Sequence, residues 1–331
     1  VQSFFVLLCP MNIGASEIIS DTHLIDKAAE GDNLVQAAAS DDVDAVVKCL
    51  GKGADPNSRK AEWTALMWAA HKGNDKIADE LLKREEIDPN IRADSWTALI
   101  WATYSDRANI VKKLLKHHKG TNSNIQNEID PNIRTDDDGD TALIVAVRHD
   151  RKNIVDELLA DRKVDPNLQI DPNIKNNYGE TAWELADQEN REDILKKLLN
   201  HKNINPNVRN SGGWTALMMA IDRGYDEIAQ KLLDHSEIDL NIKNNYGETA
   251  LFFAINKGNE KIAQKLLDHS EIDPNIQDNN GGTALLLAIS KGNEKIAQKL
   301  LDHSEIDPNI QDNNGGTALD YAISKQKVGI I

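Results

Sequence analysis

One unit of about 34 residues recurs along the chain and constrains its fold more than any other feature. Its marker is a Thr-Ala-Leu triplet, once Thr-Ala-Trp, whose threonine stands at positions 64, 97, 141, 181, 215, 249, 283 and 317. The spacings are 33, 44, 40, 34, 34, 34 and 34 residues. A fixed period of this size predicts a stack of similar supersecondary units that share a continuous core.

The residues that follow each threonine predict a short, mostly buried helix. When columns are counted from the threonine, column +2 is leucine or, once, Trp183, column +4 is apolar, and column +5 is always alanine. Apolar residues at this spacing lie on one helix face. The invariant alanine leaves room for a neighbouring helix to pack closely.

Column +9 predicts where this first helix ends. Gly, Asn and Asp enter the left-handed region of backbone space at little cost, and helices often end on such a residue. We therefore expect a left-handed residue at this column in seven units: Gly73, Asp106, Asp150, Asn190, Gly224, Gly258 and Gly292.

A second helix and a turn complete the unit. Isoleucine stands at column +13 and a Leu-Leu pair follows, so that these side chains share one buried face. An Asp-Pro-Asn turn comes next, because proline cannot continue a helix and Asp and Asn side chains close turns on their own backbone. A polar loop then leads to the next threonine, which is placed to cap the following helix.

This order of helix, left-handed stop, helix, turn and loop resembles the ankyrin repeat, G-x-T-P-L-H-x-A-A-x-x-G-x-x-x-(I/V)-(V/A)-x-x-L-L-x-x-G-A-D-x-N. The resemblance covers roughly residues 31–331. Alanine replaces the proline of the family pattern after each threonine, and other residues replace its histidine, which affects local capping bonds only. The resemblance implies a mainly α solenoid of helix–turn–helix units joined by β-hairpin-like loops.

Residues 22–331 are predicted to form one repeat domain. Its first unit covers about 31–63, full units start at Thr64, Thr97, Thr141, Thr181, Thr215, Thr249 and Thr283, and a truncated unit starts at Thr317. Residues 1–21 are predicted to be a leader that is disordered or not part of the mature chain, with Met11 as an alternative start. An insertion around 117–128 and a duplicated turn at 165–173 enlarge two loops. The incomplete last unit suggests a fragment of a longer protein.

Charge and cysteine content narrow the classes of partner. The net charge of −16 and the pI of about 5.0 disfavour nucleic acid and anionic membranes, because both would be repelled. Cys9 and Cys49 lie on separate segments and do not predict a disulfide framework. We expect an intracellular, cytoplasmic setting or delivery into a host cell as an effector.

Residues with catalytic or metal-binding chemistry do not form a recognisable site. His201, His235, His269 and His303 share one column, but adjacent repeats lie roughly 8–10 Å apart and zinc ligands must each lie about 2 Å from the metal. These histidines are therefore interpreted as solvated surface residues. Nucleotide-binding, Cys-x-x-Cys and Gly-x-Ser-x-Gly motifs are absent from the sequence. We expect no catalytic residue, cofactor, metal or small-molecule substrate.

Column −1, directly before the threonine, supplies the candidate binding residues. It holds Trp63, Trp96 and Trp214, but also Asp, Glu and Gly in other units, which predicts an exposed position. The resemblance places this column at the hairpin tips of a concave binding face, where exposed aromatic side chains favour partner binding. Trp68 and Trp101 at the uniformly apolar column +4 are predicted to be core. The candidate partner-binding residues are Trp63, Trp96, Trp214, Tyr178 and Tyr246.

These observations predict a non-catalytic protein-interaction module, a scaffold or adaptor that binds a partner protein on its concave face. An alternative remains open: the chain would be the targeting arm of a larger enzyme or secreted effector whose catalytic part lies outside it. A passive spacer without a specific partner is a third interpretation.

Overall fold

The computed structural model describes residues 28–117, 127–160 and 169–325. The predicted leader 1–21, most of the insertion at 117–128 and the first half of the duplicated turn at 165–173 lie outside these residues. The chain forms two compact units. Unit 1 comprises residues 1–136 and 156–169, and unit 2 comprises residues 137–155 and 170–331. The division passes through helix α8 (Lys152–Leu159).

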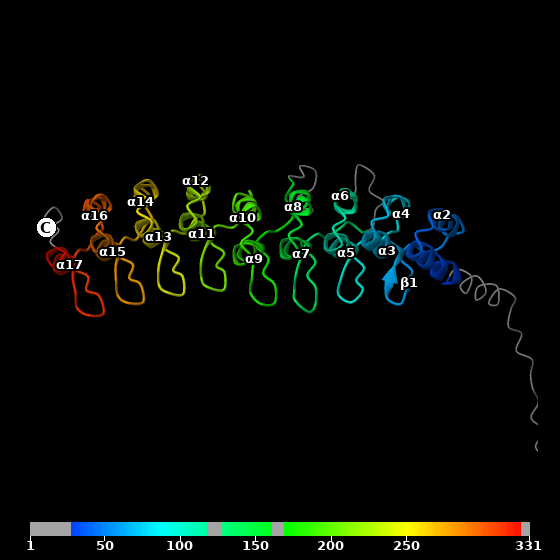
Figure 1. Cartoon of the computed structure of the whole chain (residues 1–331), viewed down its shortest axis with the longest axis horizontal. Helices are drawn as coiled ribbons and strands as arrows, with labels where there is room; N and C mark the ends of the chain where they lie inside the picture. The colour runs from blue at the N-terminus through cyan, green and yellow to red at the C-terminus, as the bar shows by residue number, and fades with distance from the viewer. Residues whose placement is uncertain (1–27, 118–126, 161–168, 326–331) are drawn as a thin grey trace, which may run out of the picture. The chain divides into compact units, whose positions relative to one another are not determined.

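Unit 1 consists of paired helices and short hairpins (Figure 1). A helical segment at residues 28–39 precedes α2 (Val43–Gly51). The pair α3 (Ala65–Lys72) and α4 (Asp75–Leu82) follows, then the pair α5 (Ala98–Tyr104) and α6 (Ala108–Lys116). Strands β1 (Arg59–Lys60) and β2 (Trp63–Thr64) form an antiparallel hairpin, in which Lys60 pairs with Trp63.

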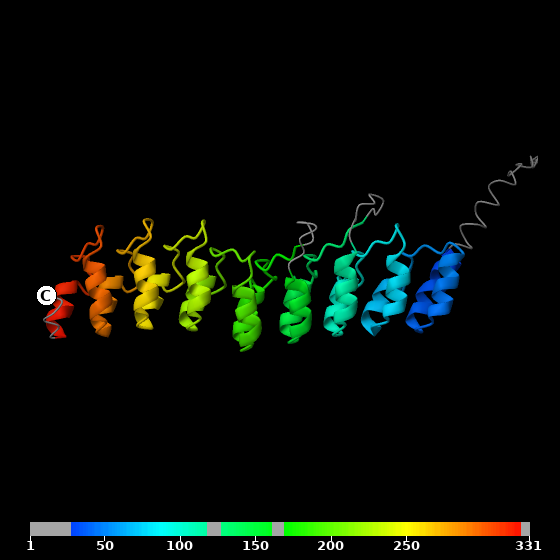
Figure 2. The ribbon, with the colours of Figure 1, turned by 90° about the horizontal axis from the view of Figure 1, so that it is seen from above.

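Unit 2 repeats the helix pair (Figure 2). Its inner helices are α7 (Ala142–Arg148), α9 (Ala182–Gln188), α11 (Ala216–Asp222), α13 (Ala250–Asn256), α15 (Ala284–Lys291) and α17 (Ala318–Ser324). Its outer helices are α10 (Glu192–Leu199), α12 (Asp226–Leu233), α14 (Glu260–Leu267) and α16 (Glu294–Leu301). Each inner helix follows a polar hairpin loop, and the outer helices lie on the side opposite these loops (Figure 1).

Inner helices pack on inner helices, and outer helices pack on outer ones. In unit 1, α3 contacts α5 and α4 contacts α6; in unit 2, α13 contacts α15 and α14 contacts α16. The alanines at column +5 are at most 2% exposed, which permits this close approach. Leu285 is 1% exposed because the next repeat covers it, whereas its equivalent Leu319 on α17 is 53% exposed. Burial therefore depends on stacking as much as on the repeat itself.

The predicted helix boundaries are confirmed. Column +9 has positive φ in all seven units, from 54° at Asp150 to 84° at Gly73. Threonine caps the inner helix through its hydroxyl in seven of eight units; at Thr249 the side chain makes no such hydrogen bond. Thr64 illustrates the rule, since its Oγ1 accepts the amide hydrogen of Met67 at 3.3 Å.

The asparagine of the Asp-Pro-Asn turn, or of its variants Asn-Pro-Asn at 205–207 and Asp-Leu-Asn at 239–241, joins one repeat to the next. Asn275 shows the pattern: its Nδ2 donates to the carbonyl of Glu305 at 2.6 Å, and its Oδ1 accepts the amide hydrogen of Asp307 at 2.8 Å. Its own amide donates to Asp273, which closes the turn as expected. Equivalent donations to the next turn come from Asn57, Asn90, Asn132, Asn173, Asn207 and Asn241. This column therefore stabilises the stack by a polar ladder outside the apolar core.

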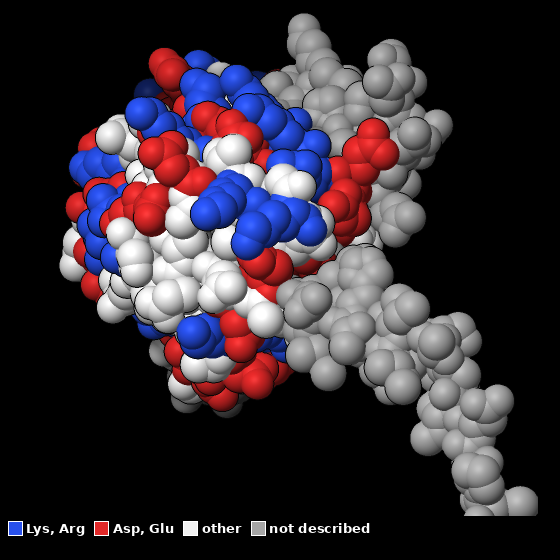
Figure 3. Space-filling model, turned by 90° about the vertical axis from the view of Figure 1, so that its right-hand side faces the viewer, with Lys and Arg blue, Asp and Glu red and all other residues white. Residues whose placement is uncertain are grey.

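Charges of both signs cover the N-terminal end of unit 1 (Figure 3). Salt bridges there include Lys52–Glu30 and Lys72–Asp41, with side chains that remain partly exposed. Such pairs contribute little to stability because water screens them. The net charge of −16 thus does not produce a uniformly acidic surface at this end.

Candidate partner-binding surface

Six aromatic side chains of unit 1 gather where two adjacent repeats meet. We call Trp63, Trp68, His71, Trp96, Trp101 and Tyr104 the aromatic cluster. They occupy columns −1, +4 and +7 of the repeats that start at Thr64 and Thr97. Column −1 lies at the foot of the hairpin, which corrects its expected place at the tip, because Trp63 belongs to strand β2 and pairs with Lys60. Columns +4 and +7 lie on the inner helix, so the fold brings the three columns together.

Trp101 is the centre of this cluster. Its ring lies 4.5 Å from that of Trp63 and 4.6 Å from that of Trp96, between centroids, with interplanar angles of 39° and 43°. Trp63 also packs on Trp68 at 4.5 Å, and Tyr104 meets Trp96 edge-on at 5.3 Å. Aromatic pairs in such geometries contribute roughly 0.5–1.5 kcal/mol beyond the area they bury. The cluster is therefore one connected set of ring contacts that spans two repeats.

The prediction that column −1 is exposed is wrong. Trp63, Trp96 and Trp214 are half-buried, and Asp140 at the same column is only 4% exposed. The reason is that neighbouring side chains cover the column: Trp63 packs on Trp68 and Trp101, and Asp140 is covered by its contact with Arg148. The prediction that Trp68 and Trp101 are core also needs correction, since both are half-buried.

Column +7 was missed by the sequence analysis, although its residues pair with column −1. Trp63 meets His71 at 5.8 Å, Trp96 meets Tyr104, and Asp140 pairs with Arg148. The sequence contains a signal for this pairing. In unit 1, where column −1 is Trp, column +7 is His71 or Tyr104. Where column −1 is Asp140, column +7 is the basic residue Arg148. Tyr104 is 41% exposed and forms the solvent-facing edge of the aromatic cluster.

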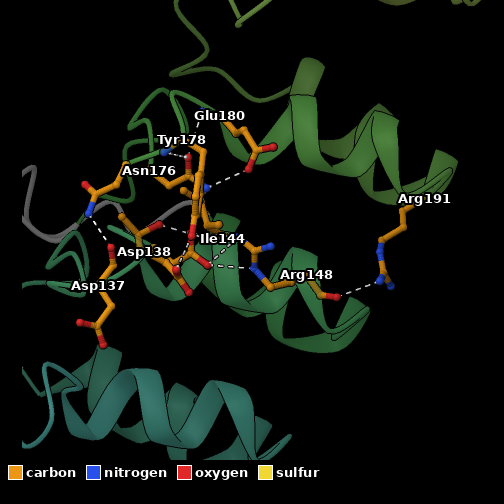
Figure 4. Close-up of polar contacts among 11 residues, drawn as sticks. Asp137, Asp138, Ile144, Arg148, Asn176, Tyr178, Glu180 and Arg191 are labelled. Carbon is orange, nitrogen blue, oxygen red and sulfur yellow. Dashed lines mark hydrogen bonds and ion pairs between the residues drawn. The ribbon is translucent and has the colours of Figure 1, made fainter.

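Asp140 shows how unit 2 fills the same position with polar groups, and its partners Arg148 and Asn176 are labelled in Figure 4. Its carboxylate accepts from Arg148 Nε at 2.9 Å and Nη2 at 3.2 Å, and from Asn176 Nδ2 at 3.1 Å. Burial raises the pKa of the Asp140 carboxyl above its ordinary value, and the attraction of Arg148 opposes this shift. The guanidinium replaces the aromatic neighbour that a tryptophan would contact.

The remaining candidates belong to unit 2 and lie outside the aromatic cluster. Trp214 packs on Phe253, with 4.3 Å between ring centroids. Tyr178 and Tyr246 are 65% and 66% exposed at their hairpin tips. The Tyr178 hydroxyl donates to Asp138 at 2.9 Å, and this hydrogen bond raises the pKa of the phenol (Figure 4).

The hairpins that carry Trp63 and Trp96 have a strained backbone. Each tip has two consecutive non-glycine residues with positive φ: Ala61 at 48° and Glu62 at 68°, Asp94 at 47° and Ser95 at 73°. A two-residue hairpin turn of this kind favours Asn-Gly, and alanine in the left-handed region costs about 1 kcal/mol. Strain of this kind often accompanies a functional site.

The histidines at the shared column have a local role. Nδ1 of His235 accepts the amide hydrogen of Glu237 at 3.3 Å, and Nδ1 of His303 accepts that of Glu305 at the same distance. These rings are half-buried turn caps, a correction to their interpretation as solvated side chains. Within residues 28–117, 127–160 and 169–325, no group of three or more His, Cys, Asp or Glu is placed to hold a metal ion.

Comparisons with known proteins agree with the repeat architecture. A family model described as ankyrin repeats (three copies) matches residues 34–127, 119–210, 186–278 and 270–331. A protein described as VAPYRIN-LIKE from Medicago truncatula is 47% identical over 66 residues, which is 19% of this chain and 14% of that protein. The chain therefore matches only a small part of that relative.

Ankyrin repeats indicate a protein-interaction module, and proteins built from them are generally non-catalytic. Among the described helices, none has the length and apolar character needed to cross a lipid bilayer. The helix pairs, the left-handed stops, the capping threonines and the matched segments along the chain lead to one conclusion: this chain belongs to the ankyrin-repeat family.

Proposed function

We propose that the protein is a scaffold or adaptor that binds a partner protein on the concave face formed by its hairpins and inner helices, with the aromatic cluster as the principal contact. The observation that carries this proposal is the continuous stack of four tryptophans and Tyr104 in two adjacent repeats. Other repeats fill two of these columns with polar residues, for example Asp140 and Arg148. The aromatic cluster is thus a local feature that repeat architecture alone does not require.

Two further observations support a binding role. A few residues supply most of the binding free energy at protein interfaces, and Trp and Tyr are enriched among them. The cluster also stands on two hairpins whose non-glycine tips carry positive φ, a costly arrangement that keeps Trp63 and Trp96 in place. A rigid, stacked surface loses little side-chain entropy when a partner covers it.

Tyr104 provides the sharpest test because it is the most exposed member of the cluster. We expect Tyr104→Ser to weaken partner binding by about 2 kcal/mol, roughly 30-fold in Kd. Stability should fall by about 1 kcal/mol, because the edge-on contacts of Tyr104 with Trp96 and Trp101 are lost. The experiment is affinity capture from the source cells with quantitative mass spectrometry, followed by titration of each purified partner. The matched control is Val47→Ser, because Val47 is 43% exposed on outer helix α2.

The double variant Trp63→Ala, Trp96→Ala extends the test. It should lower binding further, but stability will also fall since both side chains are half-buried, so binding is measured below the onset of thermal unfolding. Tyr178→Ser and Tyr246→Ser report separately on the tips of unit 2. If Tyr104→Ser and the folded double variant bind every partner as tightly as the unaltered chain, the aromatic cluster is not the contact surface.

A further inference from the structure

In unit 2, the column −1 side chain Trp214 packs on Phe253 at column +4 of the next repeat, whereas two other repeats have glycine at column −1. Where Trp214 occupies this column, Met219 of the same repeat and Phe253 of the next repeat are each 5% exposed. The repeats that start at Thr283 and Thr317 have Gly282 and Gly316 instead. Their column +4 residues, Leu287 and Tyr321, are only half-buried.

The missing side chain leaves a hollow of about 220 Å³ beside Gly282. Apolar groups of Leu286, Leu287 and Tyr321 line it, together with the carboxylates of Asp278 and Asp312. A Cβ atom added at Gly282 would lie 3.4 Å from its nearest neighbour, Asp278 Oδ1, so the position has room for a side chain. The hollow therefore lies beside a position that can accommodate a side chain.

Asp278 and Asp312 accept hydrogen bonds, but among the residues that the structure describes no Lys, Arg or His pairs with them. Asp278 Oδ1 accepts from the amides of Asn280 and Gly282, each at 2.8 Å, and Asp312 accepts from Gly316 N at 2.8 Å and from the Tyr321 hydroxyl at 2.7 Å. These donors lower the pKa of Asp312, with the Tyr321 hydrogen bond as the largest cause. Within the described residues, neither carboxylate forms an ion pair.

We propose that this hollow binds an arginine side chain from an extended segment of a partner protein. The methylene stem would cover Leu287, and the guanidinium would lie against the Tyr321 ring and between the two carboxylates. A purely apolar or aromatic side chain fits the hollow less well, since it would remove water from two charges without pairing them. This proposal does not depend on the aromatic cluster of unit 1.

The probe for this site is Nα-acetyl-arginine-N-methylamide, titrated into the ¹⁵N-labelled full chain and followed by NMR. The chemical shifts of the Leu287 and Ser290 amides should change and reach saturation as the probe is added. Both residues line the hollow. Neither belongs to the 29-residue segment that occurs twice, at 257–285 and 291–319. The citrulline analogue keeps the shape of arginine without its charge, so it should bind at least tenfold more weakly. The tryptophan analogue tests an aromatic occupant.

Two variants complete the experiment, and each introduces a residue that another repeat of this chain has at the same column. Gly282→Trp copies the arrangement at Trp214 and should fill the hollow and abolish the shifts. Asp278→Asn with Asp312→Asn places asparagine where Asn210 and Asn244 stand in other repeats, which preserves the turns and should weaken arginine binding about tenfold. Thermal denaturation checks that both variants fold. If Gly282→Trp does not fold, arginine binding to the double asparagine variant tests the proposal.

Three outcomes would overturn the proposal. The first is equal binding of the arginine and citrulline probes. The second is tighter binding of the tryptophan probe, which would make the hollow an aromatic site. The third is an unchanged arginine affinity in the folded double asparagine variant.

Discussion

The hairpins of unit 1 and unit 2 connect the same kind of helix pair by different physical means. In unit 1, two-residue tips without glycine position tryptophans that stack on each other. In unit 2, the loops are longer, contain a glycine with positive φ, and are joined tip to tip by asparagine: Asn245 donates to Ser211 O, Asn279 to Asn245 O, and Asn313 to Asn279 O. Adjacent repeats can thus be held in register either by aromatic packing or by a ladder of asparagine hydrogen bonds.

This difference has a consequence for function. The polar ladder of unit 2 satisfies its own hydrogen-bonding groups and leaves Tyr178 and Tyr246 as separate exposed rings. The aromatic cluster of unit 1 concentrates apolar surface in one place at the cost of backbone strain. If a partner binds the aromatic cluster as proposed, it would contact a continuous apolar surface in unit 1.

The largest expected effect comes from removing the centre of the aromatic cluster. Trp101→Ala should lower the free energy of unfolding by about 3 kcal/mol, the low end for tryptophan because the ring is only half-buried. Trp214→Ala provides the comparison in unit 2: Trp214 stands at column −1, its contact with Phe253 is lost, and the substitution should cost about half as much. Urea denaturation followed by far-UV circular dichroism measures both. Equal losses would mean that the stack adds nothing beyond single ring contacts.

An intermediate loss of stability is expected when a glycine in a hairpin tip of unit 2 is replaced. Gly281 has φ of 78°, and a Cβ atom there would lie 2.6 Å from the amide nitrogen of Asn313 in the next tip. Gly281→Ala should therefore cost about 2 kcal/mol, half from the left-handed backbone and half from the displaced tip.

Gly315 is the matched control, since it has φ of 81° within the same local sequence and no described atom lies within 4 Å of its added Cβ. Gly315→Ala should cost about 1 kcal/mol. Thermal and urea denaturation of the two variants isolate the contact between tips. If both substitutions cost the same, tip-to-tip packing is not what requires glycine in unit 2.

The smallest effect is expected from relieving strain in unit 1. Ala61→Asn with Glu62→Gly supplies the residues that a tip with two positive φ values favours, and should stabilise the protein by about 1 kcal/mol. The measurement is the midpoint of urea denaturation. Partner binding serves as a second readout, because a better turn leaves Trp63 in place and should keep affinity unchanged. A loss of stability would show that these tips are not strained.

The repeat unit could be predicted from the sequence because its determinants are local. Threonine caps, left-handed stops at column +9 and Asp-Pro-Asn turns each depend on residues within four positions of one another, and eight copies supply an internal comparison. The invariant alanine likewise predicted close helix packing, and Ala69, Ala102 and Ala146 are fully buried. The ankyrin fold follows from these local signals.

Burial at column −1 could not be predicted in the same way. The mixture of Trp, Asp, Glu and Gly at this column suggested exposure, yet each residue type meets a different neighbour: Trp63 meets Trp101, Asp140 meets Arg148, and Gly282 leaves a hollow. Variation at a column reflects solvent exposure only when the surroundings are the same in every repeat. In this chain the neighbouring residues at columns +4 and +7 change together with the residue at column −1.

The sequence by itself determined the helix pair, its ends and the order of repeats, since these depend on backbone preferences and on contacts close in the chain. Only the tertiary structure decided which side chains meet across repeats: the aromatic cluster, the asparagine ladders and the hollow at Gly282. Those contacts join residues about 30 or more positions apart. Their geometry depends on how closely one repeat approaches the next, and no short-range pattern in the sequence specifies that distance.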